Sequence, residues 1–145
     1  MLIAIFGESC VGKTTLSNKL KEEFNASVFS GKDYLRLAKN EDMAKEKFKS
    51  LLLSSCTGEN LIYVITEKAH LCLLPAGAIR ILVTAPLSVI KERFSKRTGG
   101  VLPKPIENVL EAKHHSLDNE PHDFCLSYGE DITEFIHLFK QKLNK

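Results

Sequence analysis

The stretch from Met1 to Leu20 constrains the fold of this 145-residue chain more than any other part of it. Leu2 to Phe6 is a short apolar run of residues that favour β-strands. The next residues, Gly7 to Thr14, read GESCVGKT and match the pattern GxxxxGK[ST] at every fixed position. Apolar side chains at helical spacing then predict a helix from Lys13 to Phe24. Strand, glycine loop and helix in this order are the context in which the pattern binds phosphate.

The residue types in this loop explain the predicted chemistry. Gly7 permits a sharp turn, and Gly12 lets the backbone approach a phosphate closely. Successive backbone N–H groups and the start of the helix form a nest for anionic oxygens. Lys13 is expected to reach the β- and γ-phosphates, and the Thr14 hydroxyl to bind Mg²⁺. The expected nucleotide-binding residues are Gly7, Glu8, Ser9, Cys10, Val11, Gly12, Lys13, Thr14 and Thr15.

Charge and hydropathy exclude several classes of function. The net charge of +2 is close to balance, so no basic patch predicts binding to nucleic acid. The chain has no run of about 18 or more apolar residues, so we expect no membrane span. No basic segment precedes the first apolar run, which therefore does not resemble a secretion signal. We expect a cytoplasmic protein.

Cysteine and histidine spacing predicts no structural metal site. Cys10, Cys56, Cys72 and Cys125 lie far apart, so we expect reduced thiols that are mostly buried. Cys10 lies inside the predicted phosphate loop, where positive potential would make it reactive. His114, His115 and His122 are close in sequence but lack ligands at zinc spacing.

Strand-like and helix-like segments alternate along the whole chain. The predicted strands are 2–6, 26–29, 61–65, 79–84 and 124–126. The predicted helices are 13–24, 34–55, 87–96, 106–117 and one that follows Asp131. In the helix 34–55 we expect Asn40 to act as an internal N-cap and an apolar face formed by Met43, Phe48, Leu51 and Leu52. Residues 71–74 fit either a strand or a helix. This order predicts a single domain, residues 1–145, with a three-layer α/β/α fold around a parallel sheet of about five strands. Its site would lie outside the carboxyl ends of the strands.

Several polar and charged residues follow these strand ends. Asp33 and Arg36 come after the second strand, Arg93 and Arg97 follow the fourth strand at helical spacing, and Tyr128 follows the fifth. Together with the phosphate loop, this order resembles the small P-loop kinases, which include the nucleoside-monophosphate kinases and the shikimate-kinase-like enzymes. The resemblance covers nearly the whole chain, and the loop is its most specific part.

The resemblance implies a P-loop NTPase fold, ATP and Mg²⁺ as cofactors, and phosphoryl transfer to a small molecule. It implies catalytic roles for Lys13, Asp33, Arg93 and Arg97, with Asp33 and Arg36 binding the acceptor. The arginines and Asp33 also have interpretations that involve no catalytic role. The arginines would also suit a solvated basic face, and Asp33 would also suit a helix N-cap. Tyr128 would either stack on a base or pack against the sheet.

Glu67 departs from the pattern of that group, whose members usually carry an aspartate near the end of the third strand. We expect Thr14 and Glu67 to hold the metal, although Glu67 would also suit an ion pair with Lys68. Specificity for the acceptor is expected to come from side chains of residues 33–55, although their sequence does not define the shape of a pocket.

Three functional hypotheses remain. The first is an ATP-dependent kinase for a small acceptor, most readily a nucleotide or nucleoside. The second is a nucleotide-binding protein without turnover, which the glutamate at position 67 keeps open. The third is a GTPase-type switch, which ranks lowest because no NKxD motif follows a later strand and no DxxG follows the third.

Overall fold

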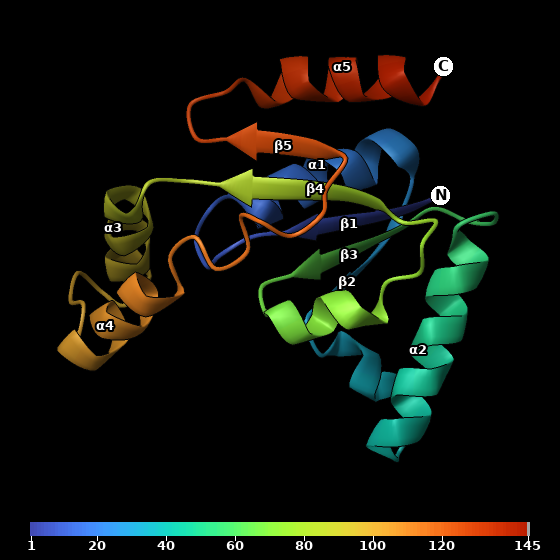
Figure 1. Ribbon diagram of the computed structural model, residues 1–145, viewed down its shortest axis with the longest axis horizontal. Coiled ribbons are helices and arrows are strands. Elements are labelled where there is room, and N and C mark those ends of the chain that lie inside the picture. The colour runs from blue at the N-terminus through green and yellow to red at the C-terminus, as the bar shows by residue number, and fades with distance from the viewer. Residues whose placement is uncertain (145) are drawn as a thin grey trace.

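The computed structural model describes residues 1–144 and places a five-stranded parallel sheet at the centre of the molecule (Figure 1). The strand order is β2-β3-β1-β4-β5. The bounds are β1 Leu2–Phe6, β2 Ser27–Ser30, β3 Leu61–Ile65, β4 Ile79–Thr84 and β5 Phe124–Ser127. The first strand lies between β3 and β4, with Leu2 opposite Leu61 and Ile3 opposite Ile79. The predicted α/β fold with its parallel sheet is confirmed.

Side chains of the central strands point alternately to two separate cores, as the twofold period of a strand requires. Ile3 and Ile5 face one core, whereas Leu2, Ala4 and Phe6 face the other. Both faces are covered, which explains why β1 and β3 are apolar at every position.

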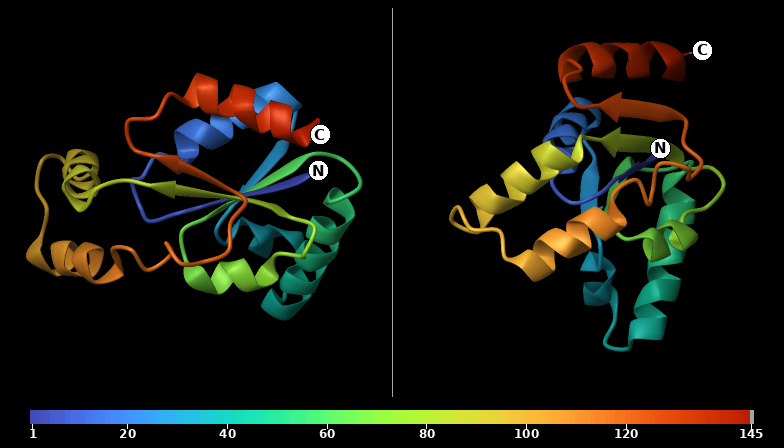
Figure 2. Two further views of the ribbon diagram at one scale, coloured as in Figure 1. Left: turned by 45° about the horizontal axis from the view of Figure 1, so that its top comes forward. Right: turned by 60° about the vertical axis from the view of Figure 1, so that its left-hand side comes forward.

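The helices divide between the two faces of the sheet (Figure 2). Helices α1 (Lys13–Phe24) and α5 (Ile132–Leu143) cover the first face, and α2 (Glu41–Ser55) covers the second with two short 3₁₀ helices, Asp33–Leu37 and Lys68–Leu73. Helices α3 (Leu87–Arg97) and α4 (Lys104–Lys113) form an arm beyond the carboxyl ends of the strands (Figure 1). The whole arm, residues 87–113, therefore projects on the side where the phosphate loop lies.

The structure corrects two predicted helices. The segment 34–55 is not continuous, because Ala38 is extended and the Asn40 side chain accepts hydrogen bonds from the backbone N–H groups of Asp42 and Met43, which starts a new helix there. The helix predicted to run to residue 117 ends at Lys113, and His115 has a positive φ of 66°. The predicted cap at Asp131 is confirmed by its bond from the Glu134 N–H.

Two predictions of burial are wrong. Met43 is exposed instead of contributing to the apolar face of α2. All four cysteines are free thiols, but only Cys10 is buried, while Cys72 and Cys125 are exposed. Within residues 1–144, the helices are too short or too polar for any of them to span a membrane.

Candidate nucleotide-binding site

The phosphate loop begins where β1 meets its neighbours. The Gly7 N–H donates to the Ile65 carbonyl of β3 at 3.2 Å, which prolongs the strand pairing into the loop. A Cβ atom at Gly7 would lie 2.4 Å from the Val83 carbonyl oxygen of β4, so only glycine fits there. Further on, Cys10 and Gly12 have φ of 65° and 109°, which curl the backbone before α1 begins.

Lys13 is held at the centre of this loop. Its side chain is buried, and Nζ donates to the carbonyls of Gly7 and Glu8 at 2.8 Å and 2.5 Å. Burial lowers the pKa of Lys13 to about 8, with a smaller contribution in the same direction from the charge of Arg97. A buried ammonium group without a carboxylate on it is an electrostatically costly arrangement that an incoming anion would relieve.

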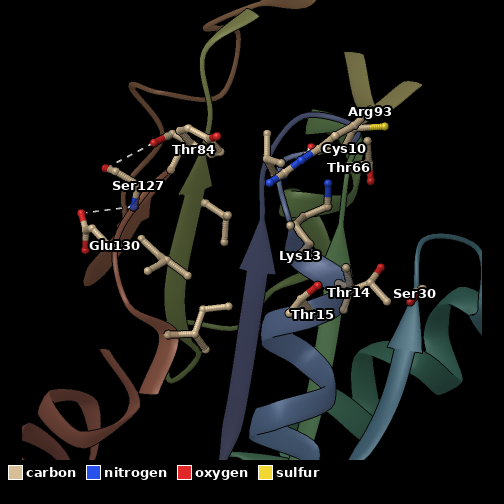
Figure 3. A pocket seen from close by; sticks show the side chains of 18 of the residues that line it. Cys10, Lys13, Thr14, Thr15, Ser30, Thr66, Thr84, Arg93, Ser127 and Glu130 are labelled. Atoms are coloured by element: carbon tan, nitrogen blue, oxygen red, sulfur yellow. Dashed lines mark hydrogen bonds between the residues drawn. The ribbon is translucent and has the colours of Figure 1, made fainter. Parts of the chain in front are cut away.

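A cavity of about 720 Å³ opens over the phosphate loop. Residues at or just after the carboxyl ends of all five strands line it, and α3 closes one side. Figure 3 shows Lys13 and Thr14 in the middle, with Ser30 on one side of them and Ser127 and Glu130 on the other. The charged lining comprises three cations, Lys13, Arg93 and Arg97, and one carboxylate, Glu130. The cavity therefore has a positive centre suited to a polyphosphate.

Both arginines predicted on α3 line this cavity. The Arg93 guanidinium donates from Nη1 to the Cys10 carbonyl at 3.0 Å and lies 5.5 Å from the centre of the Tyr128 ring. Arg97, one turn further along α3, is more exposed. The spacing of four residues thus brings both cations to the cavity over the phosphate loop, although Arg93 lies 83 positions after Cys10 in the sequence.

Five of the predicted site residues do not line the cavity. Two of them, Gly7 and Glu8, form the start of the phosphate loop, and the other three are Asp33, Arg36 and Glu67. The Asp33 carboxylate accepts a hydrogen bond from the Ser30 N–H at 2.8 Å, which stabilises the turn after β2. The Arg36 guanidinium lies 4.5 Å above the centre of the Phe29 ring. Glu67 is exposed at the start of the 3₁₀ helix Lys68–Leu73, and its neighbour Thr66 lines the cavity instead.

Comparison with solved structures identifies the fold. Bacillus subtilis YorR in complex with phosphorylated GDP superposes with a TM-score of 0.66 at 21% identity, over 100% of this chain and 99% of YorR. Shikimate kinase from Acinetobacter baumannii in complex with shikimate gives 0.68 at 12% identity, over 99% and 95% of the two chains. A sugar kinase from Janibacter gives 0.67 at 17%, over 99% and 94%. The chain has the fold of the small P-loop kinases.

The likeness to the small P-loop kinases rests on structure. A scan against protein-family models gives no match, and neither does a search of curated proteins. Because the structural identities are low, the superpositions establish the arrangement of elements, and the cavity residues have to be argued from their own chemistry.

A bound Mg²⁺ would suit the loop as the structure shows it. Thr14 lines the cavity at the start of α1, next to the Lys13 position. No group of three or more His, Cys, Asp or Glu residues within 1–144 could hold a metal ion by itself. Mg²⁺ usually keeps several waters and takes one or two protein ligands plus substrate phosphates, so Thr14 is the residue here that would hold it.

Sequence reasoning missed the contact that joins the arm to the phosphate loop. His114, just past α4, has Nδ1 2.9 Å from the Glu8 Oε1, and both side chains are largely buried. The two residues are 106 positions apart, and nothing in their local sequence predicts the pairing. The Glu8 carboxylate therefore pairs with His114, while the Glu8 backbone carbonyl accepts a hydrogen bond from Lys13 Nζ.

Hydroxyl groups to which the sequence analysis assigned no role line both ends of the cavity. Ser30, Thr66, Thr84 and Ser127 each lie at a strand's carboxyl end or one position beyond it. Their placement was available from the predicted strand ends, since those ends converge on the site. The sequence analysis assigned roles mainly to charged residues instead.

Proposed function

We propose that the protein transfers the γ-phosphoryl group of ATP to a small acceptor, within the class of nucleotides, nucleosides and comparable small molecules. The observation that supports this most is the convergence of Lys13, Arg93 and Arg97 on one cavity over the loop at the carboxyl ends of the sheet. Phosphoryl transfer needs charge neutralisation and positioning more than covalent chemistry, and this cavity supplies both.

In the proposed reaction the loop N–H groups and Lys13 hold the β- and γ-phosphates, and the Thr14 hydroxyl holds Mg²⁺. The ion would neutralise charge on the β- and γ-oxygens. Arg93 exchanges its bond to the Cys10 carbonyl for phosphate oxygens, which are stronger, charged acceptors. Arg97 adds a second guanidinium from the same helix, so charge that develops during transfer is stabilised from two directions.

Asp33, Arg36 and Glu67 keep their predicted roles as proposals. Asp33 would orient or deprotonate an acceptor hydroxyl from the turn that holds Ser30. Arg36 would bind an acceptor only after leaving the Phe29 ring. Glu67 would contact the metal through its waters, after turning from its exposed position beside the cavity.

A second candidate function is nucleotide binding without turnover. The exposed position of Glu67 outside the cavity lining favours it, because a carboxylate near the metal is then absent from the lining at the end of β3. Such a protein would retain the loop and Lys13 and bind Mg·ATP without phosphorylating an acceptor.

A coupled assay for ADP formation with Mg·ATP, run with a panel of small acceptors and beside thermal-shift measurements, separates the candidates. Lys13→Ala removes the buried ammonium group, and Lys19→Ala removes an exposed lysine of the same helix as the matched control. We expect acceptor-dependent turnover that Lys13→Ala abolishes and Lys19→Ala retains. Stabilisation by nucleotide without turnover would select the binding-only function. No stabilisation by any nucleotide would contradict both.

A further inference from the structure

We propose that the acceptor is a neutral hydroxyl compound, such as a nucleoside or a sugar-like polyol, and that it carries no phosphate group of its own. This inference rests on the proposed phosphoryl transfer and narrows its acceptor. The observation behind it is the chemical difference between the two ends of the cavity, which lie on either side of the phosphate loop (Figure 3).

The end formed by β4 and β5 suits the base of the ATP molecule. It carries the Tyr128 ring, with the Arg93 guanidinium 5.5 Å from its centre, and the apolar side chains of Leu126 and Ile132. A planar base needs a stacking surface and apolar contacts, which this end provides. The acceptor is therefore left with the opposite end, formed by β2 and β3.

That opposite end, which we call the acceptor end, consists of Ser30, Gly31, Val64 and Thr66. It offers two hydroxyl groups, one glycine backbone and one valine. Among the residues the structure describes, none of those lining this end is charged. The cations of the cavity lie at the loop and on α3, where the polyphosphate of ATP would neutralise them.

Lys32, Glu67 and Lys68 flank the acceptor end in sequence, but they are exposed and do not line the cavity. The two charged residues predicted to bind the acceptor are engaged elsewhere. Arg36 stacks on Phe29, and Asp33 binds the Ser30 N–H. The Asp33 carboxylate therefore places negative charge directly behind Ser30. A phosphate monoester carries up to two negative charges and needs an arginine or lysine to offset its desolvation. At this end it would instead meet neutral hydroxyls backed by a carboxylate.

The acceptor end is also held firmly in place. The Gly31 N–H donates to the Val64 carbonyl at 2.9 Å, and the buried Tyr63 hydroxyl donates to the Gly31 carbonyl at 2.7 Å. Burial raises the pKa of Tyr63, so this hydroxyl stays protonated and keeps donating. A fixed wall with hydroxyl donors and acceptors suits the hydroxyl groups of a polyol, because little ordering is needed on binding.

The reaction balances for such an acceptor. The acceptor oxygen forms a bond to the γ-phosphorus of ATP while the bond from that phosphorus to the β,γ-bridging oxygen breaks. The electron pair of the broken bond stays on the β-phosphate of ADP. The proton of the acceptor hydroxyl passes to the Asp33 carboxylate through water, because Asp33 does not itself line the cavity.

The test compares matched pairs of acceptors that differ only in a phosphate group. Each nucleoside is paired with its 5′-monophosphate, and glucose with glucose 6-phosphate. We expect kcat/KM for an unphosphorylated member to exceed that of its partner at least about tenfold, as ionic mismatches of this kind commonly cost. Preference for the phosphorylated members would overturn the inference and leave the proposed kinase function intact. Turnover with neither member of any pair would overturn both.

Two variants of Thr66 test whether the acceptor binds at the acceptor end. Thr66→Val removes one hydroxyl and is expected to raise the KM of the preferred acceptor about three- to tenfold, with the KM for ATP unchanged. Thr57→Val makes the same substitution at an exposed turn outside the cavity and serves as the matched control. Thr66→Lys adds a cation at the acceptor end and should shift selectivity toward phosphorylated acceptors about tenfold. An unchanged preference in Thr66→Lys and an unchanged KM in Thr66→Val would contradict the placement of the acceptor.

Discussion

The ammonium group of Lys13 is buried against two backbone carbonyls, and burial lowers its pKa from the usual 10.5 to about 8. Between these two values the folded chain binds fewer protons than the unfolded chain. The charged lysine therefore opposes folding below about pH 8, and this penalty is relieved as the pH rises toward 10.5. Relative to Lys13→Met, the free energy of unfolding of the wild type should rise by on the order of 3 kcal/mol across this window.

Urea denaturation of the nucleotide-free protein at pH 7.5, 9 and 10.5 would measure this difference. Lys19→Met provides the control, because Lys19 is an exposed lysine on the same helix. Its stability profile should run parallel to that of the wild type. A parallel profile for Lys13→Met as well would show that Lys13 titrates like a solvated lysine.

Positions 7 and 129, both near the cavity, favour glycine for different physical reasons. An alanine Cβ at Gly7 would lie 2.4 Å from the Val83 carbonyl oxygen, which belongs to the rigid sheet. At Gly129 the φ is 92°, and a Cβ would meet no atom within 4 Å. We expect Gly7→Ala to lower the free energy of unfolding by about 2–4 kcal/mol, and Gly129→Ala by about 1–2 kcal/mol. Equal losses in urea denaturation would show that steric contact at Gly7 is not decisive.

At the level of elements, α2 is held to the sheet by an aromatic cluster around Phe48. The centre of its ring lies 5.2 Å from that of Phe29, 5.3 Å from that of Tyr34 and 4.8 Å from that of Tyr63. Phe48→Ala should cost about 3–5 kcal/mol, because it removes a fully buried ring and leaves a cavity. Met43→Ala, on the exposed side of the same helix, should cost less than about 0.5 kcal/mol. Comparable losses in thermal or urea unfolding would mean that α2 does not depend on this cluster.

The elements also show what the sequence predicts well and what it does not. Gly7, Gly12 and Lys13 have a fixed spacing with a local cause, so the phosphate loop and its flanking strand and helix were predictable. The break between the first 3₁₀ helix and α2 was predicted only in part. The predicted N-cap at Asn40 is confirmed, but no residue type at position 38 signals the extended backbone there.

Contacts between distant segments were the least predictable part of the site. Asp33 and Arg36 follow a strand end as expected. The Asp33 carboxylate, however, accepts a hydrogen bond from a backbone N–H, and the Arg36 guanidinium lies over an aromatic ring. Which partner a side chain contacts depends on the folded structure and not on its local sequence. The same holds for His114, whose partner Glu8 lies on the phosphate loop at the other end of the chain.

For the molecule as a whole, the arm of residues 87–113 is a unit whose two helices are bound to each other. Lys91 of α3 contacts Glu107 and Glu111 of α4 at 3.2 Å and 2.5 Å, which ties the two helices together. The arm meets the phosphate loop through Arg93, and the segment just after it does so through His114. Gly99 and Gly100, both with positive φ, lie in the exposed connection between the helices.

Nucleotide binding should draw this arm onto the body, because bound phosphates offer Arg93 and Arg97 stronger acceptors than the Cys10 carbonyl. Hydrogen exchange with Mg²⁺ and a non-hydrolysable ATP analogue would report it. Amides of α3 and of the connection 98–103 should exchange at least about tenfold more slowly, whereas those of α2, on the far face of the sheet, should not change. Lys13→Ala should lose the protection throughout. Protection of the phosphate loop without protection of α3 would mean that the arginines do not follow the nucleotide, and that the arm stays where the structure places it.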